Sequence, residues 1–238
     1  MNSNFVRVTF ASVYADIIVM KQLSKDDMQK YNLDGLVIQA TNNAFDILKE
    51  LYKNGTSANT KLIIPPYYHS KKNTNGDQKI CFRLSEQELR FLFVEQISKL
   101  LPDGYSYSIE SPTLQLYRFT KKGEKLKPLL RGEGESGNFD FTIQQSGHVE
   151  AIVEFKARTL DSFSYAKDLC KLWNPIEGQD ALRYFIIVFE SLTKSKYESL
   201  IDAIKNNKYF RKQDGDADVF VVCKSLSNGQ EFEISKMM

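Results

Sequence analysis

Apolar residues recur along this chain with two different periods, and the change of period predicts where helices and strands lie. Runs with the helical period of about 3.6 residues occupy 42–54, 86–101, about 162–173 and 195–206. Alternating or continuous apolar runs, typical of strands, occupy 5–20 (as one or two strands), 62–64, 105–117, 138–144, 149–157, 184–189 and 218–223. From residue 85 onward the order is helix, three strands, helix and strand, followed by one more helix and strand. We therefore expect an α/β fold with a mixed central sheet flanked by helices.

The helix expected at 86–101 has recognisable ends. Ser85 and Glu88 have the spacing of a capping box, in which each side chain bonds to the other residue's backbone N–H. Pro102–Gly104 follows the last apolar position and is expected to end the helix.

The most informative polar positions lie in the two strands 138–144 and 149–157. Side chains of a strand point alternately to its two faces, and Ser146-Gly147 between the strands predicts a turn. If the strands pair as a hairpin, Asp140, Glu154 and Lys156 converge on one face of the sheet. The opposite face would then be apolar and would carry Phe139, Phe141, Ile143, Val153, Phe155 and Ala157. An E-x-K on a strand has a simpler alternative, which is a solvated sheet face with a weak ion pair.

The bulk composition narrows the class of protein. The chain has 238 residues, 42% of them hydrophobic and 12% aromatic, which suits one large domain, or one domain with an extension, around a real core. A net charge of +2 means that any nucleic-acid surface would be a local patch. Three cysteines without a C-x-x-C and only two histidines argue against a disulfide framework, a zinc site and HNH-type chemistry. Without a signal sequence or a long apolar run, we expect a cytoplasmic protein that makes no membrane contact.

Two neighbouring carboxylates repel each other unless they are protonated, paired with a cation or bound to a metal. Mg²⁺ prefers oxygen ligands and usually takes one or two carboxylates. A lysine two residues from one ligand can orient an attacking water or stabilise charge on a phosphate. This combination suits metal-assisted hydrolysis of a phosphodiester.

The segment 85–190 resembles the PD-(D/E)XK nuclease superfamily, which has the restriction-endonuclease-like fold. That family has the element order αβββαβ, with its metal-binding Asp on the second strand and its E-x-K on the third. Asp140 and Glu154-Phe155-Lys156 match those positions, and Phe139 stands where the motif has its proline. Residues 136–140 also resemble the small-residue turn before this Asp in archaeal Holliday-junction resolvases and restriction enzymes. The resemblance implies a nuclease-like domain at 81–238, preceded by an N-terminal α/β extension at 1–80.

The resemblance also implies a set of site residues. Asp140, Glu154 and the backbone carbonyl of Phe155 would bind Mg²⁺, or Mn²⁺ in its place, and Lys156 would be catalytic. The family often adds a glutamate from the first core helix; Glu95 is favoured by its position near the end of the helix, and Glu88 is the second candidate. Lys171, on the helix after the E-x-K, is a further polar residue that this helix can offer to the site.

The function implied is a metal-dependent nuclease, most readily a DNA endonuclease of restriction, repair or phage-defence type, with RNA as a second substrate class. A basic loop could grip phosphates and comprises Lys121, Lys122, Lys125, Lys127 and Arg131, although a solvated loop has the same composition. The alternative function is a catalytically inactive nuclease fold that binds nucleic acid or assembles with other proteins. A homodimer or a partner protein is compatible with either function.

Overall fold

The computed structural model of the chain describes residues 25–72, 78–118, 127–129, 135–157, 162–207, 209, 212–227 and 231–237. Its helices are α2 (Lys25–Asn54), α3 (Glu86–Leu100), α4 (Ser162–Trp173), the 3-10 turn η1 (Pro175–Glu177) and α5 (Lys194–Lys205). Its strands are β1 (Pro66–Lys72), β2 (Gln78–Phe82), β3 (Tyr105–Arg118), β4 (Lys127–Leu129), β5 (Glu135–Gln145), β6 (His148–Ala157), β7 (Leu182–Phe189), β8 (Val219–Ser225) and β9 (Glu231–Met237). The strands expected at 5–20 lie outside the described residues.

A mixed sheet of seven strands forms the centre of the molecule, in the order β4-β3-β5-β6-β7-β8-β9. The pairs β3–β5 and β5–β6 are antiparallel, whereas β6–β7 and β7–β8 are parallel. The expected hairpin at 138–157 and the expected strands and helices of the core are therefore confirmed. The short edge strands β4 and β9 were not expected from the sequence.

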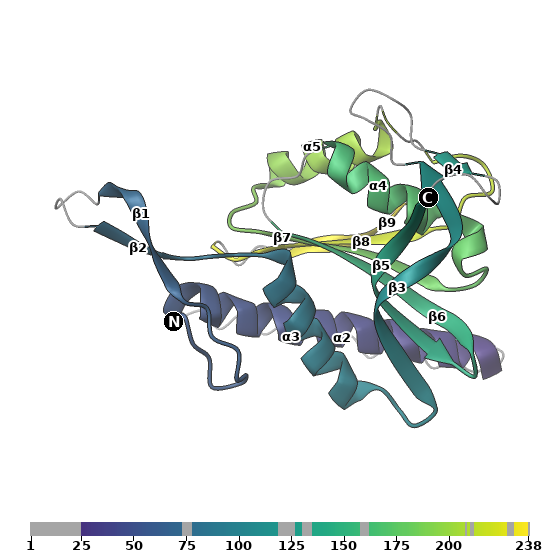
Figure 1. Cartoon of the computed structure of the whole chain (residues 1–238), viewed down its shortest axis with the longest axis horizontal. Helices are drawn as coiled ribbons and strands as arrows, with labels where there is room; N and C mark the ends of the chain where they lie inside the picture. The colour runs from purple at the N-terminus through teal and green to yellow at the C-terminus, as the bar shows by residue number, and fades with distance from the viewer. Residues whose placement is uncertain are drawn as a thin grey trace, which may run out of the picture.

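Helices cover both faces of this sheet and create two apolar layers (Figure 1). On one face α2 and α3 pack against the sheet around Phe93, Phe141 and Phe155. On the other face α4 and α5 pack around Leu169 and Phe185. The α/β architecture expected from the element order is thus present, with the sheet between two helical layers.

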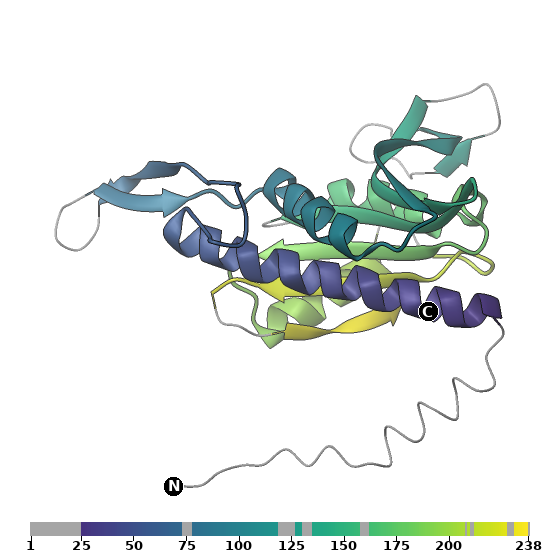
Figure 2. The same ribbon diagram turned by 90° about the horizontal axis from the view of Figure 1, so that it is seen from below.

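Helix α2 is longer than the periodicity predicts, because the expected helix at 42–54 is only its second half. The helix runs along the sheet (Figure 2), and its buried residues belong to the same core as α3. The hydroxyl of Tyr184 on β7 donates a hydrogen bond to Asp34, which ties the first half of α2 to the centre of the sheet. No helix in the described ranges is long and apolar enough to cross a membrane.

The strand expected at 62–64 does not form. Ile64 is buried and its N–H donates to the carbonyl of Gly55 at 2.9 Å, whereas Ile63 is exposed. The next strand, β1, starts at Pro66 and pairs with β2 as a separate two-stranded sheet that projects from the body (Figure 1). The apolar residues at 62–64 therefore anchor a loop, and the two prolines that follow prevent their backbone from joining a central strand.

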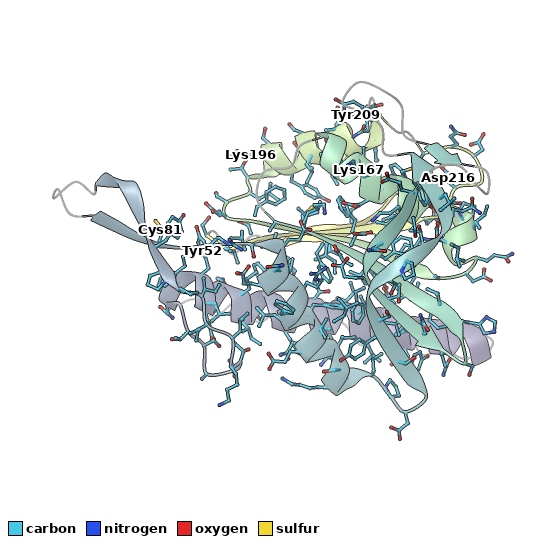
Figure 3. All side chains as sticks on the ribbon, in the orientation of Figure 1. Tyr52, Cys81, Lys167, Lys196, Tyr209 and Asp216 are labelled. Atoms are coloured by element: carbon cyan, nitrogen blue, oxygen red, sulfur yellow. The ribbon has the colours of Figure 1, made fainter. Side chains whose placement is uncertain are left out.

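The hairpin β1–β2 joins the body beside the end of α2. Tyr52 and Cys81 lie close together at this junction (Figure 3). Burial, followed by the nearby Glu190 carboxylate, raises the pKa of the Tyr52 hydroxyl. The phenol therefore stays neutral and links the helix to the start of the next loop.

The capping box expected at the start of α3 is wrong. Ser85 is the N-cap residue, but its side chain makes no capping hydrogen bond. Ser85 Oγ and Glu88 Oε2 both lack a hydrogen-bond partner among the residues that the structure describes. The helix is held instead by its buried face, which comprises Leu89, Leu92, Phe93, Gln96 and Ile97.

The packing of Phe93 yields the first prediction. Its ring is fully buried and lies 5.2 Å from the ring of Phe141 and 5.1 Å from that of Phe155, measured between centroids. Phe93→Ala should lower the free energy of unfolding by about 3–5 kcal/mol in urea titrations. The matched control is Phe91→Ala, two residues away and 52% exposed, which should change it by less than about 0.5 kcal/mol. A loss below about 1 kcal/mol for the Phe93 variant would contradict this packing.

Candidate functional site

The strands β5 and β6 separate at Asp140, and this fork creates the site. Their backbone pairing ends at Phe141 and Val153. One residue beyond, the N–H of Phe155 donates to Oδ2 of Asp140 at 2.8 Å instead of to a strand carbonyl. The Asp140 side chain therefore stands between the two strands, in the register position opposite Glu154.

The fork also corrects one expectation about the sheet faces. Phe141 lies in the layer under α2 and α3, as does Phe155. Phe139 was expected beside them but packs in the layer under α4 and α5. Simple alternation fails there because β5 leaves β6 at Asp140, and beyond this point its pairing is with β3.

Glu154 is buried on the α4 side of the fork. Its side chain is 2% exposed, and its Oε1 accepts a hydrogen bond from Nζ of Lys171 at 2.5 Å. The same ammonium donates to the carbonyl of Asn138 at 2.6 Å and lies 3.2 Å from Asp168 Oδ1. Lys171, the further polar residue suggested by the sequence, is thus the direct partner of Glu154.

Lys156 bridges the two helical layers at the open end of the fork. Its Nζ lies 3.2 Å from Oε1 of Glu86 on α3 and 2.9 Å from Oδ2 of Asp168 on α4. It also donates to the carbonyl oxygen of Phe155 at 3.0 Å. The lysine of the E-x-K therefore touches the same backbone carbonyl that the sequence nominated as a metal ligand.

An ion pair closes the α3 side of the site. Nη1 of Arg90 contacts Oε1 of Glu110 and lies 3.4 Å from Oδ1 of Asp140. Glu110 sits opposite Asp140 in the β3–β5 register and has φ of 55°, a backbone conformation that favours glycine. A glutamate in that conformation stores on the order of 1–3 kcal/mol of strain, and such strain gathers at functional sites.

The eight charged side chains of this site form one network, which we call the fork cluster. The cluster comprises Glu86, Arg90, Glu110, Asp140, Glu154, Lys156, Asp168 and Lys171. Its five carboxylates outnumber its three cations by two, so a fully ionised cluster lacks two positive charges. One divalent cation would supply that difference.

Burial and mutual charge shift the pKa values of this cluster. Burial raises the pKa of Glu154 well above 4.5, with Asp168 and Asp140 adding to the effect and Lys171 opposing it. Burial also raises the pKa of Glu86. For Lys156, burial acts to lower the pKa, but the carboxylates around it outweigh burial and raise it. These groups hold their protons more firmly than exposed ones, as is typical of functional sites.

Glu95 does not join the fork cluster. Its Oε2 accepts a hydrogen bond from Thr60 at 2.8 Å, and its Oε1 pairs with Lys99 at 3.1 Å. Glu86 is the α3 carboxylate that reaches the cluster, and Glu95 lies nine residues after it, about two and a half helical turns and therefore on the opposite face. Glu88 makes no contact with the cluster either.

Sequence reasoning missed Glu86 and Arg90, and it left Asp168 as a residue of an exposed helix face. A signal existed for the first two, because Glu86 and Arg90 are four residues apart and therefore share a helix face. The expected basic loop lies outside the described residues at Lys121, Lys122, Lys125 and Arg131. Lys127 lies in β4, at the edge of the sheet.

The residues present fit a hard divalent cation. Among the described residues no group of three or more His, Cys, Asp or Glu side chains could hold a metal. The donor set suggested here has only two such side chains, Asp140 and Glu154, with the Phe155 carbonyl as third donor, and Mg²⁺ usually takes no more than two carboxylates. Each of these three donors already lies against a cationic side chain, from Arg90, Lys171 and Lys156 respectively.

Comparisons with protein-family models, curated proteins and solved structures gave no match to this chain. Its function is therefore argued from the chemistry of the fork cluster.

The buried state of Glu154 predicts a pH dependence of stability. Because its folded-state pKa is raised above 4.5, its contribution is greatest below that pH and is lost as the pH rises through the raised value. Glu154→Gln cannot ionise, so its free energy of unfolding should gain on that of the wild type as the pH increases from about 4 to about 8. Urea unfolding of both proteins across this range measures the difference. A difference that stays constant or shrinks with pH would show that Lys171 fully offsets the burial of this carboxylate.

Proposed function

We propose that this chain is a magnesium-dependent nuclease with the restriction-endonuclease-like fold, acting on DNA in restriction, repair or phage defence. The element order α3-β3-β5-β6-α4-β7, interrupted only by the short β4, supports the fold, since it is the order that the family resemblance implies. The observation that carries the function is the convergence of Asp140, Glu154 and Lys156 at the fork.

The alternative of a solvated sheet face with a weak ion pair has less support. Glu154 is 2% exposed, and the side chains of Lys156 and Asp168 are each 12% exposed. Taking several charges out of water is costly, and a buried ion pair often stabilises a fold less than apolar side chains of the same size. A cluster of this kind is therefore better explained by chemistry than by stability.

The proposed roles follow from position. Asp140, Glu154 and the Phe155 carbonyl would hold Mg²⁺, or Mn²⁺, which supplies an activated water and neutralises charge on the phosphate. Lys156 lies beside the Phe155 carbonyl, where its ammonium can orient water or stabilise charge that develops on the phosphate. Glu86 and Asp168 hold that ammonium in place from two different helices.

One assay tests the proposal. The purified chain is incubated with plasmid, single-stranded DNA and RNA, in Mg²⁺, in Mn²⁺ and in EDTA. We expect cleavage of DNA that needs the divalent ion and is absent in EDTA. A protein that binds nucleic acid but cleaves none of these substrates with either ion would instead be the inactive binding module.

Lys156→Ala should reduce metal-dependent cleavage by about 10²-fold or more, because charge stabilisation at the reacting phosphate is lost. Lys156 is 12% exposed and bridges two carboxylates, so thermal unfolding must first show that the variant is folded. The matched control is Lys99→Ala on α3, where a 55% exposed lysine pairs with Glu95. Undiminished cleavage by the folded Lys156 variant, beside a reaction without enzyme, would contradict the proposed role.

The two glutamates of α3 give a second comparison. Glu86→Gln should lower the cleavage rate about 10-fold or more, since groups that orient a metal site typically have effects of this size. Glu95→Gln should leave the rate within about twofold, because Glu95 contacts Thr60 and Lys99 outside the cluster. Initial rates of both variants measure the difference. Equal losses, or a larger loss for Glu95→Gln, would mean that the cluster is not the reaction centre.

A further inference from the structure

Three exposed apolar side chains gather beside the fork cluster. They are Phe91 on α3, which is 52% exposed, and Tyr107 and Ile109 on β3, which are 41% and 40% exposed. Seven large apolar side chains are this exposed among the described residues, so nearly half of them lie at this one place. Single exposed apolar residues are normal in proteins, whereas a group of them beside a polar site indicates an interaction surface.

These residues lie on one side of the sheet and next to one cation. Tyr107 pairs with Ile143 and Ile109 with Phe141 in the β3–β5 register, so both side chains lie on the face that α3 covers. The ring of Tyr107 stacks on that of Phe141 at 5.3 Å between centroids. α3 and this part of β3 are joined by the Arg90–Glu110 ion pair, whose two members directly adjoin Phe91 and Ile109 in sequence. We call Arg90, Phe91, Tyr107 and Ile109 the stacking strip.

The outer edge of β3 leaves this strip open. β4 pairs with β3 only from Leu116 to Arg118, so β3 before Leu116 has no outer strand partner among the described residues. Arg90 remains 15% exposed, and its Nε has no hydrogen-bond partner in the described part of the chain. The strip therefore presents aromatic and aliphatic surface together with an arginine whose hydrogen-bonding capacity is not filled.

We propose that the stacking strip binds a single-stranded segment of nucleic acid and leads it to the fork cluster. Arg90 takes a backbone phosphate, and Phe91 and Tyr107 stack on bases. The proposal rests on the proposed nuclease function for the direction in which the strand runs. It extends that function by naming the form of substrate that the site accepts.

The composition of the strip favours a single strand over a duplex. A duplex hides the faces of its bases and is held mainly by many cations on its phosphates. The strip offers one cation and three apolar side chains, which is the combination that binds unpaired bases by stacking. The arginine supplies the charge complementarity to the phosphate, since guanidinium groups match phosphate oxygens well.

The test is a binding measurement in EDTA, where cleavage plays no part. Fluorescence anisotropy compares a labelled single strand of about 16 nucleotides with the duplex of the same sequence. Phe91→Ala should weaken binding of the single strand at least about fivefold and leave duplex binding within about twofold. The matched control is Ile176→Ala on η1, equally exposed at 57% and distant in the fold from α3, which should leave both affinities unchanged.

A second variant tests the phosphate contact. Arg90→Gln should reduce the slope of log affinity against log salt for the single strand by about 0.7, the value of one neutralised phosphate on a single strand. Phe91→Ala should leave that slope unchanged, because stacking releases no counterions. The two variants thus separate the base contact from the phosphate contact.

Three results overturn the proposal: wild-type protein that does not bind the single strand, Phe91→Ala that binds it as wild type does, or Phe91→Ala that loses single strand and duplex equally. Its failure is distinguishable from failure of the nuclease function. Strand binding that depends on Phe91 in a protein that cleaves nothing refutes the nuclease alone. Metal-dependent cleavage by a protein whose binding ignores Phe91 refutes the strip alone.

Discussion

The hydrogen bond from the Phe155 N–H to the Asp140 carboxylate is the interaction on which the site depends. It replaces a backbone bond between β5 and β6, so the two strands can separate without leaving a buried N–H unpaired, which would be costly. Separation places Asp140 between the strands and turns the following part of β5 toward β3. Helices from both layers then reach the same point, α3 with Glu86 and Arg90 and α4 with Asp168 and Lys171.

The price of this arrangement is a set of charges that are largely withdrawn from water. Each carboxylate of the cluster has a cationic partner, so no buried charge stands alone. The balance is still incomplete, since five carboxylates share three cations. Burial and like charge raise the pKa of Glu154 and Glu86, which shows where the cluster is least satisfied. A divalent cation and a phosphate are together the kind of ligand that such a site lacks, and this reasoning links the electrostatics of the fork to the proposed hydrolysis.

The sequence predicted the parts of the fold that follow from local periodicity. The strands around Asp140 and Glu154, and the helices α3, α4 and α5, lie where apolar spacing placed them. It could not predict that Phe139 changes sides, since this depends on a hydrogen bond between strands. The choice of Glu95 over Glu86 failed because the rotation of α3 about its axis is set by packing of Phe93 against two strands. Asp168 and Lys171 carried no distinguishing local signal, because an exposed helix face has the same composition.

The central claim is that the fork between β5 and β6 is a divalent-metal site, and anomalous scattering from crystals soaked in Mn²⁺ tests it most directly. The account predicts one strong anomalous peak within about 2.0–2.4 Å of oxygen atoms of Asp140, Glu154 and the Phe155 carbonyl, with Lys171 displaced from Glu154. The same soak of an Asp140→Asn crystal should show the peak weakened or absent. A fork that binds no Mn²⁺ while the Lys171–Glu154 pair stays intact would contradict the claim, and the cluster would then be a structural network of buried charges.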